Sequence, residues 1–200
     1  MSVRGGRRAA RRRETGVTVI SIDLDLDGSG TTSVRTGLPF FDHMLAQLGR
    51  HGGFDLVVEA DGDLEIDAHH TVEDTGILLG EVFAAALGDK VGVRRFADRA
   101  VPLDEALVSA ALDLSGRPYL HYDIDFPGEK ILGEPPFDPQ LTEEFWRAFV
   151  TSAGITLHLV GVRGRNTHHI VEAAFKAVAR ALRDAVRVES DELPSTKGLL

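Results

Sequence analysis

A five-residue motif, His-His-x-x-Glu, occurs twice in this 200-residue chain, and its repetition constrains the fold more than any other feature. The first copy is His69-His70-Thr71-Val72-Glu73 and the second is His168-His169-Ile170-Val171-Glu172. Each copy opens a segment in which apolar residues recur at helical spacing, so both motifs are expected in the first turns of long helices. A motif repeated in the same setting indicates two related halves.

The segments that precede the two motifs correspond as well. When Phe54 is aligned with Ile155, the positions eleven residues earlier are His43 and Glu144. In each half a helix leads to a strand, a turn and a longer helix, and the second turn is two residues shorter. The sequence therefore predicts an internal duplication, with residues 14–96 as the first half and residues 97–186 as the second.

In the first half, alternating apolar residues predict a strand at 17–26, and residues 27–30 suit a hairpin turn. Pro39 is placed to begin a helix that Gly52 and Gly53 end. A strand at 54–60, a turn at 61–63 and a second short strand through Ile66 should follow. A helix at 69–87 completes the half.

The second half is expected to begin with two strands between residues 97 and 125, joined through residues 115–118. A Gly- and Pro-rich linker at 128–139 precedes a helix at 141–153, a strand at 155–162 and a helix from 168 to about 186. Strands and helices in one repeated order predict an α+β fold. Its duplicated βαβ-type halves should form mixed sheets with helices packed on one face.

Composition excludes several classes of protein. The absence of cysteine excludes disulfides, thiolate catalysis and sulfur-ligated zinc. No apolar run is long enough to span a membrane, and the N-terminus lacks a secretory signal. The expected location is therefore the cytoplasm, with no membrane partner.

The N-terminal segment 1–13 carries six arginines and no acidic residue. Without these arginines, 16 basic residues stand against 31 acidic ones, and so acidic a body argues against nucleic acid as a partner. A nucleic-acid arm and a transit peptide are alternatives for this segment. A solvated, disordered leader is favoured.

The repeated motif has the geometry of a metal-binding site. Residues four apart lie on one face of a helix, so His69 with Glu73, and His168 with Glu172, can reach a common ion. Adjacent histidines leave a helix about 100° apart and are expected to serve different ions or different neighbours. A pair of ions, each bound by residues from both halves or from two subunits, satisfies this geometry.

Eight side chains are candidate ligands, four from each half: His43, His69, His70, Glu73, Glu144, His168, His169 and Glu172. Four protein ligands for each ion would leave open positions on an octahedral centre for substrate and water. Manganese, iron, zinc and nickel all accept imidazole and carboxylate, and manganese is favoured here. A single His-His pair is more often a structural feature of a helix N-terminus, but two matching copies favour metal binding.

A second set of polar residues suits phosphate. Arg95 and Arg117 lie near expected strand ends, and Ser195 and Lys197 lie in the closing segment 187–200. Two arginines, a lysine and a serine are a suitable set for binding phosphate oxygens. The alternative for the closing segment is a loose tail. From the sequence alone, three further histidines are interpreted as structural or exposed: His51, His121 and His158.

Five separated motifs resemble those of the imidazoleglycerol-phosphate dehydratases. They are Phe41-Asp42-His43-Met44-Leu45, Asp67-Ala68-His69-His70-Thr71-Val72-Glu73-Asp74, Asp113-Leu114-Ser115-Gly116-Arg117-Pro118, His168-His169-Ile170-Val171-Glu172-Ala173 and Pro194-Ser195-Thr196-Lys197-Gly198. They stand in the family's order, and the similarity extends from Glu14 to the C-terminus.

The resemblance implies a hydro-lyase of histidine biosynthesis, which converts D-erythro-imidazole glycerol phosphate into imidazole acetol phosphate. It also implies a duplicated fold of the ribosomal protein S5 domain 2 type and two Mn²⁺ ions in each active site. The assembly that it implies is a homo-oligomer of 24 subunits, with active sites between subunits.

The resemblance also implies roles for individual residues. The ligands that it carries over are His43, His69, His70, Glu73, His168, His169 and Glu172. The substrate-contacting residues are Glu14, His43, Gln47 and His51, together with Arg95, Arg117, Ser195 and Lys197, which hold the phosphate. The catalytic glutamates are Glu172, Glu14 and Glu73. The chain departs from the family at Glu144, where many members have histidine, and by two extra residues between Glu14 and Asp27.

As a hypothesis for the mechanism, the substrate imidazole loses a proton and bridges the two ions as imidazolate, which promotes loss of the hydroxyl on the adjacent carbon. Glu172 or Glu14 would transfer protons, and the phosphate-binding residues would orient the substrate. Two alternatives use the same residues. A two-metal phosphate-ester hydrolase would release free phosphate, and a metal-storage assembly would bind ions without turnover.

Overall fold

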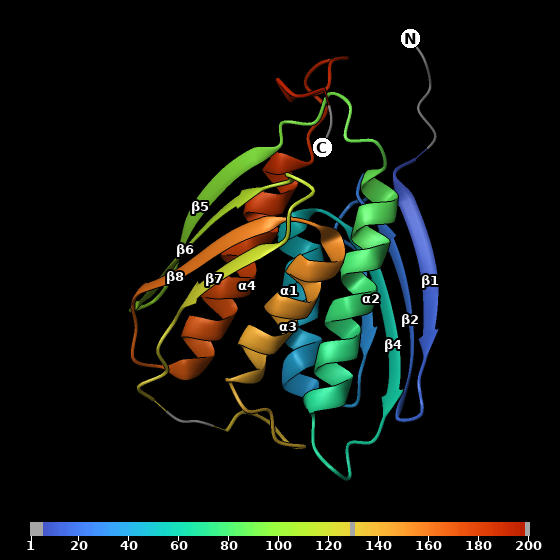
Figure 1. Ribbon diagram of the computed structural model, residues 1–200. Helices are drawn as coiled ribbons and strands as arrows, with labels where there is room; N and C mark the ends of the chain where they lie inside the picture. Colours follow the sequence, from blue (N-terminus) through green and yellow to red (C-terminus); the bar gives the residue numbers. More distant parts are fainter. Residues whose placement is uncertain (1–5, 129–130, 199–200) are drawn as a thin grey trace.

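The computed structural model describes residues 6–128 and 131–198 and arranges them as two four-stranded sheets with four helices between them (Figure 1). The first half contains β1 (Arg8–Glu14), β2 (Thr18–Asp25), β3 (Thr32–Arg35), α1 (Pro39–Gly52), β4 (Asp55–Gly62) and α2 (His69–Leu87). The second half contains β5 (Phe96–Leu103), β6 (Ala106–Asp113), β7 (Tyr119–Asp123), α3 (Leu141–Ala153), β8 (Thr156–Arg163) and α4 (Thr167–Ala185).

The two halves repeat one topology. The strand orders are β1-β2-β4-β3 and β5-β6-β8-β7, and in each sheet the last strand is parallel to its neighbour while the other pairs are antiparallel. The predicted duplicated α+β fold is confirmed, and the predicted boundary between the halves falls at Phe96, where β5 begins. Among the described residues, no helix combines the length and the apolar character that a membrane span needs.

The helices lie between the sheets because each sheet has one apolar face. Alternate residues are buried along the central strands, for example Ile20 and Ile22 on β2, and Val108 and Ala110 on β6. Helix α2 packs on β1 and β2, and α4 packs on β5 and β6. Helix α1 packs against α4, and α3 against α2, so the two most extensive contacts between helices join the two halves.

Two glycines let α2 and α3 approach closely. A Cβ atom on Gly76 would lie 2.7 Å from the carbonyl oxygen of Phe145, and one on Gly80 would lie 2.6 Å from that of Phe149. Larger residues there would push the helices apart. Because the contacts advance in the same direction along both helices, the first turns of α2 and α3 lie together, and these turns carry predicted ligands.

The arginine-rich segment that was expected to be disordered forms β1 instead. Residues 8–14 pair antiparallel with β2, whereas the first five residues of the chain lie outside the described part. Arg8 pairs with Asp23, and Arg13 pairs with the buried Asp74 of α2. Backbone pairing and distant carboxylates stabilise a segment whose composition alone resembles a solvated tail, so the first half begins at Arg8 rather than at Glu14.

All four helices begin and end within one residue of their predicted bounds, but three predictions about strands are wrong. Strands β2 and β3 form no hairpin, because β4 lies between them. Residues 64–66 form a turn rather than a strand. Three strands rather than two follow α2: β5 and β6 form a hairpin, and β7 pairs with β8. Local alternation reveals a strand, but its neighbour depends on residues far away in sequence.

Candidate active site

Three predicted ligands from both halves meet in one cluster. His43 of α1 and His168 of α4 place their Nε2 atoms 3.2 and 3.0 Å from the same oxygen, Oε2 of Glu172. One potential ligand atom from each residue lies within 4.8 Å of the others. We call His43, His168 and Glu172 the tight donor set. It joins one residue of the first half to two of the second.

Neighbouring groups keep Glu172 ionised. Burial by itself raises the pKa of this carboxyl group, but hydrogen bonds from Lys176, His168 and His43, with the positive charge of Lys176, together lower it to about 2. The Nζ atom of Lys176 lies 2.6 Å from Oε1 of Glu172, and both side chains are largely buried. Lys176 was not predicted as a site residue. Its signal in the sequence was a lysine four residues after the motif glutamate, in an apolar stretch of helix.

Two further residues of α1 extend this cluster. The Nε2 atom of Gln47 lies 3.4 Å from Nδ1 of His43, and Nε2 of His51 lies 3.0 Å from Oε1 of Gln47. These residues form a polar row at four-residue spacing on one helix face. Burial, together with the charges of Lys176 and Arg180, lowers the pKa of His51. The structure thus places His51 beside the tight donor set.

The corresponding residues of the other motif are less closely gathered. Nε2 of His69 lies 4.0 Å from Oε2 of Glu73, and both side chains are nearly half exposed. His69 and Glu144 line one cavity of about 560 Å³, and the carboxylate of Glu144 lies 3.8 Å from Arg147. We call His69, Glu73 and Glu144 the open donor set. Its members occupy positions equivalent to the tight donor set without sharing an oxygen.

Within each motif the two histidines contact different carboxylates. His69 and His168 lie nearest to the motif glutamates, at 4.0 and 3.0 Å, whereas His70 and His169 contact carboxylates outside the motif. Different neighbours are what the rotation of about 100° between adjacent helix positions predicts. The second histidine of each motif therefore contacts a residue outside the donor set to which the first belongs.

Carboxylates that sequence analysis did not single out contact the second histidines. Asp63 lies 2.9 Å from Nδ1 of His70, and Glu105 lies 2.8 Å from Nδ1 of His169. Asp63 stands in the loop before the first motif, seven residues before His70, and two other acidic residues lie closer to the histidine pair. Glu105 is 64 residues from its partner, and nothing in the local sequence points to that contact.

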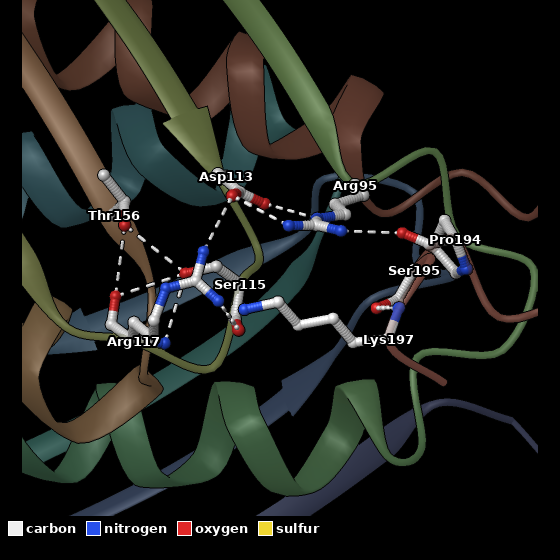
Figure 2. A network of polar contacts seen from close by, with 8 residues as sticks. All are labelled: Arg95, Asp113, Ser115, Arg117, Thr156, Pro194, Ser195 and Lys197. Carbon is white, nitrogen blue, oxygen red and sulfur yellow. Dashed lines mark hydrogen bonds and ion pairs between the residues drawn. The ribbon is translucent and has the colours of Figure 1, made fainter. Parts of the chain in front are cut away.

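Two of the predicted phosphate-binding residues flank one carboxylate (Figure 2). Arg95, just before β5, places Nε 2.6 Å from Oδ1 of Asp113 at the end of β6. Arg117, in the loop before β7, places Nη2 3.8 Å from Oδ2 of the same residue. Asp113 was not predicted as a site residue, and it holds the two guanidinium groups at one edge of the second sheet.

The C-terminal segment brings the other two phosphate-binding residues to the same corner. Arg95 donates a hydrogen bond of 2.7 Å to the carbonyl oxygen of Pro194, so the described part of this segment is tied to the sheet rather than loose. The backbone N–H of Lys197 donates to Oγ of Ser195 at 3.2 Å. Figure 2 shows the side chain of Lys197 extending toward Arg117. Residues 199 and 200 of the predicted segment lie outside the described residues.

The tight donor set and the phosphate-binding corner lie at opposite ends of α4. Glu172 is near its start, whereas the backbone N–H of Arg95 donates to the carbonyl oxygen of Ala185, its last residue. At 1.5 Å per residue, the two ends are about 20 Å apart along the helix axis. One small substrate cannot bridge that span within a single copy.

Glu14 is paired within its own strand. It ends β1, its side chain is 60% exposed, and its carboxylate lies 2.8 Å from Nη1 of Arg12. Its described contact is therefore an ion pair within its own strand rather than a contact with a predicted ligand.

Two sets of imidazole and carboxylate donors, with a separate group of cations that suits phosphate, define a class of protein. These are enzymes of duplicated α+β fold that act on small phosphorylated molecules. Comparisons with known proteins agree with this class. Residues 36–182 match the family described as imidazoleglycerol-phosphate dehydratase.

Curated relatives of the same description match over nearly the whole chain. The protein from Paracoccus denitrificans is 56% identical, covering 97% of this chain and 100% of its own, and that from Acidothermus cellulolyticus is 55% identical, covering 98% and 95%. The crystal structure from Staphylococcus aureus is 36% identical, with a TM-score of 0.79 and coverage of 89% and 97%. The chain therefore belongs to the imidazoleglycerol-phosphate dehydratase family, and it is a hydro-lyase.

Proposed function

We propose that this enzyme removes water from D-erythro-imidazole glycerol phosphate to give imidazole acetol phosphate, with two Mn²⁺ ions in each active site. The observation that carries the proposal is the tight donor set, in which residues of both halves converge on one carboxylate oxygen. Relatives at 56% and 55% identity are named for this dehydration. Because the reaction belongs to histidine biosynthesis, we also propose a cytoplasmic location.

The donor chemistry fits the proposed ions. Imidazole nitrogen and carboxylate oxygen without sulfur suit Mn²⁺, and an ionised carboxylate between two imidazoles is ready to accept a divalent cation. The tight donor set would hold one ion and the open donor set the other, with His70 and His169 as further ligands. When bound, such ions lower the pKa of groups attached to them, including an imidazole of the substrate.

The two motif glutamates suit different tasks. With its pKa at about 2, Glu172 remains a carboxylate throughout the neutral range and is suited to binding. Glu73 is nearly half exposed, and Ile77 occupies the position that corresponds to Lys176. We therefore assign proton transfer to Glu73 first. Glu14, whose exposed carboxylate pairs with Arg12, is the second candidate for proton transfer.

The phosphate-binding corner supplies orientation. Two guanidinium groups and an ammonium provide charged donors for phosphate oxygens, and the hydroxyl of Ser195 adds a neutral one. Asp113 and the carbonyl oxygen of Pro194 hold Arg95 in place before substrate arrives. A substrate fixed by its phosphate presents its imidazole and hydroxyl groups to the donor sets at a defined distance.

We propose that a second copy of the chain completes each active site, within a homo-oligomer of 24 subunits as the family resemblance implies. The separation of about 20 Å along α4 supports this, because phosphate and imidazole must then be bound by different copies. His70 and His169 contact Asp63 and Glu105 rather than the donor sets, so both remain available as ligands for an ion shared with a neighbour.

The activity is tested by an assay on imidazole glycerol phosphate that follows the ketone product, with Mn²⁺ added and then withdrawn by a chelator. We expect turnover that requires the ion and returns when the ion is restored. Free phosphate as the product would favour the hydrolase alternative. Stoichiometric Mn²⁺ binding without turnover would favour storage.

The shared site is tested by mixing two inactive variants. Glu172→Gln damages the tight donor set and Arg95→Ala damages the phosphate-binding corner. If the two regions of one site come from different copies, random mixed assemblies restore about one quarter of the sites, because the intact regions of both variants can meet. Activity that stays absent in mixed assemblies would place both regions in one copy.

A further inference from the structure

The second histidine of each motif is held in the same way. Nδ1 of His70 lies 2.9 and 3.2 Å from the two carboxylate oxygens of Asp63, and Nδ1 of His169 lies 2.8 Å from Oε2 of Glu105. An ionised carboxylate only accepts hydrogen bonds, so Nδ1 of each ring carries the proton. In the neutral ring, the lone pair then resides on Nε2, on the side away from the carboxylate.

From this geometry we propose that Asp63 and Glu105 are positioning residues, which fix the orientation and tautomer of His70 and His169 so that each Nε2 is presented to a metal ion. The inference rests on the proposed function, since it assumes that these histidines are ligands. Partners of this kind raise the basicity of a ligating imidazole and restrict its rotation.

Both carboxylates are themselves held in place. Asp63 has only 11% of its side chain exposed. The second oxygen of Glu105 accepts hydrogen bonds from the backbone N–H groups of Asn166 and Arg165, at 2.8 and 3.2 Å. Glu105 thus links the turn between β5 and β6 to the start of α4, and its direction toward His169 is set by three contacts.

The duplication supplies the strongest support, because the two carboxylates come from positions that are not equivalent. Asp63 is the first residue after β4, and the first residue after β8 is Gly164. A Cβ atom on Gly164 would lie 2.5 Å from Cγ1 of Ile170, so the shorter loop of the second half leaves no room for a side chain there. The second half cannot supply a carboxylate from this position.

The converse holds for the turn that carries Glu105. Glu105 lies between β5 and β6, and the equivalent turn between β1 and β2 consists of Thr15, Gly16 and Val17, with no acidic side chain. Each half therefore supplies its carboxylate from a position at which the other half has no acidic residue. In both halves the carboxylate nevertheless contacts Nδ1 of the second histidine. An incidental ion pair, worth little at a partly exposed site, gives no reason for this coincidence.

The test is a titration of the assembled full-length enzyme with Mn²⁺, in which electron paramagnetic resonance counts the free ion. The variants are Asp63→Asn and Glu105→Gln, which keep the size of each side chain but remove its charge. Glu59→Gln is the matched control, because that carboxylate pairs with the exposed Arg35 on the outer face of the first sheet.

We expect the dissociation constant for Mn²⁺ to rise about 10- to 100-fold in each of the two variants and to stay unchanged in the control. The Mn²⁺ concentration that gives half-maximal dehydration should rise in parallel, while kcat at saturating Mn²⁺ recovers toward the wild-type value. A residue that only stabilised the fold would lower the Tm of the metal-free protein without this selective shift.

Wild-type affinity for Mn²⁺ in either variant, with the assembly intact, would overturn the assignment for that residue alone. Absence of Mn²⁺ binding by the wild-type enzyme would instead overturn the proposed metal centre, and this inference with it.

Discussion

The two halves of the chain carry equivalent donors in different states of assembly. In the tight donor set two imidazoles share one carboxylate oxygen beside a buried ammonium, whereas in the open donor set the nearest imidazole and carboxylate are 4.0 Å apart. Ile77 stands at the position that corresponds to Lys176, and Glu144 at that of His43. The spacing within the motif therefore predicts which side chains are donors. The distances between these donors depend on residues outside the motif.

The largest effect on activity should come from substitution of the motif glutamates. Glu172→Gln removes the oxygen on which the tight donor set converges, so we expect kcat/KM to fall by at least about 10²-fold, together with a loss of Mn²⁺ affinity. Glu73→Gln should lower kcat comparably but weaken Mn²⁺ binding much less, because the open donor set is not built around one oxygen. Steady-state kinetics and Mn²⁺ titration measure both quantities. Weaker Mn²⁺ binding in Glu73→Gln than in Glu172→Gln would contradict the stronger role in metal binding given to Glu172.

The next effect concerns the residues that the two short helices contribute. His43→Ala should raise the dissociation constant for Mn²⁺ by about 10- to 100-fold, an effect comparable to loss of an ordered partner group at a metal site. Glu144→His should leave Mn²⁺ binding and turnover nearly unchanged, because imidazole is an equivalent donor there. A severe loss of activity in Glu144→His, in protein that still assembles, would show that the open donor set requires a carboxylate.

A smaller and pH-dependent effect should follow from Lys176→Met. In the wild-type chain the pKa of Glu172 is lowered to about 2, so the carboxylate stays ionised from neutral pH down to that value. Without the ammonium, burial raises this pKa, and protons should compete with Mn²⁺ at a pH about one to three units higher. Ile77→Met is the matched control in α2. An acid limb of Mn²⁺ binding that does not move in Lys176→Met would contradict the role given to this lysine.

The same pKa has a consequence for stability. Because the folded value lies below the ordinary value of 4.5, the contacts of Glu172 stabilise the fold fully above about pH 4.5 and less as the pH falls toward 2. In Lys176→Met, the stability of the fold should fall less on acidification, because the pKa of Glu172 is no longer lowered by the ammonium. Thermal unfolding of the metal-free protein between pH 5 and pH 3 measures it.

The smallest effects concern β1, whose buried carboxylate partner in α2 has no counterpart in α4. The buried Asp74 accepts hydrogen bonds from Arg13 and Thr18, and Ala173 occupies its equivalent position in α4. Arg13→Met should lower the free energy of unfolding by about 1–3 kcal/mol, since it removes a partner of a buried carboxylate. Arg8→Met, which breaks an exposed pair, should cost less than about 1 kcal/mol. Urea unfolding at one protein concentration measures both, and equal effects would contradict the difference in burial.

Much of this architecture could be predicted from the sequence because it depends on local pattern. The helical spacing of apolar residues predicted all four helices, and the repeated motif indicated both the duplication and the candidate ligands. The rotation between neighbouring helix positions also predicted that His69 and His70 would have different neighbours, which are Glu73 and Asp63.

What could not be predicted depends on contacts between distant residues. Strand β1 is arginine-rich, and its order depends on pairing with β2 and on carboxylates that are distant in sequence, among them Asp74. The contact between Glu105 and His169 crosses 64 residues, and it exists because the turn between β5 and β6 lies beside the start of α4. No periodicity within one segment records such a contact.

We propose that donors from the two halves hold two ions in each active site. Anomalous diffraction at the manganese absorption edge, from crystals grown with Mn²⁺, locates such ions. We expect one peak bound by His43, His168 and Glu172 and a second bound by the open donor set, each approached by Nε2 of His70 or His169. Peaks located elsewhere, or none at these side chains at saturating Mn²⁺, would contradict it.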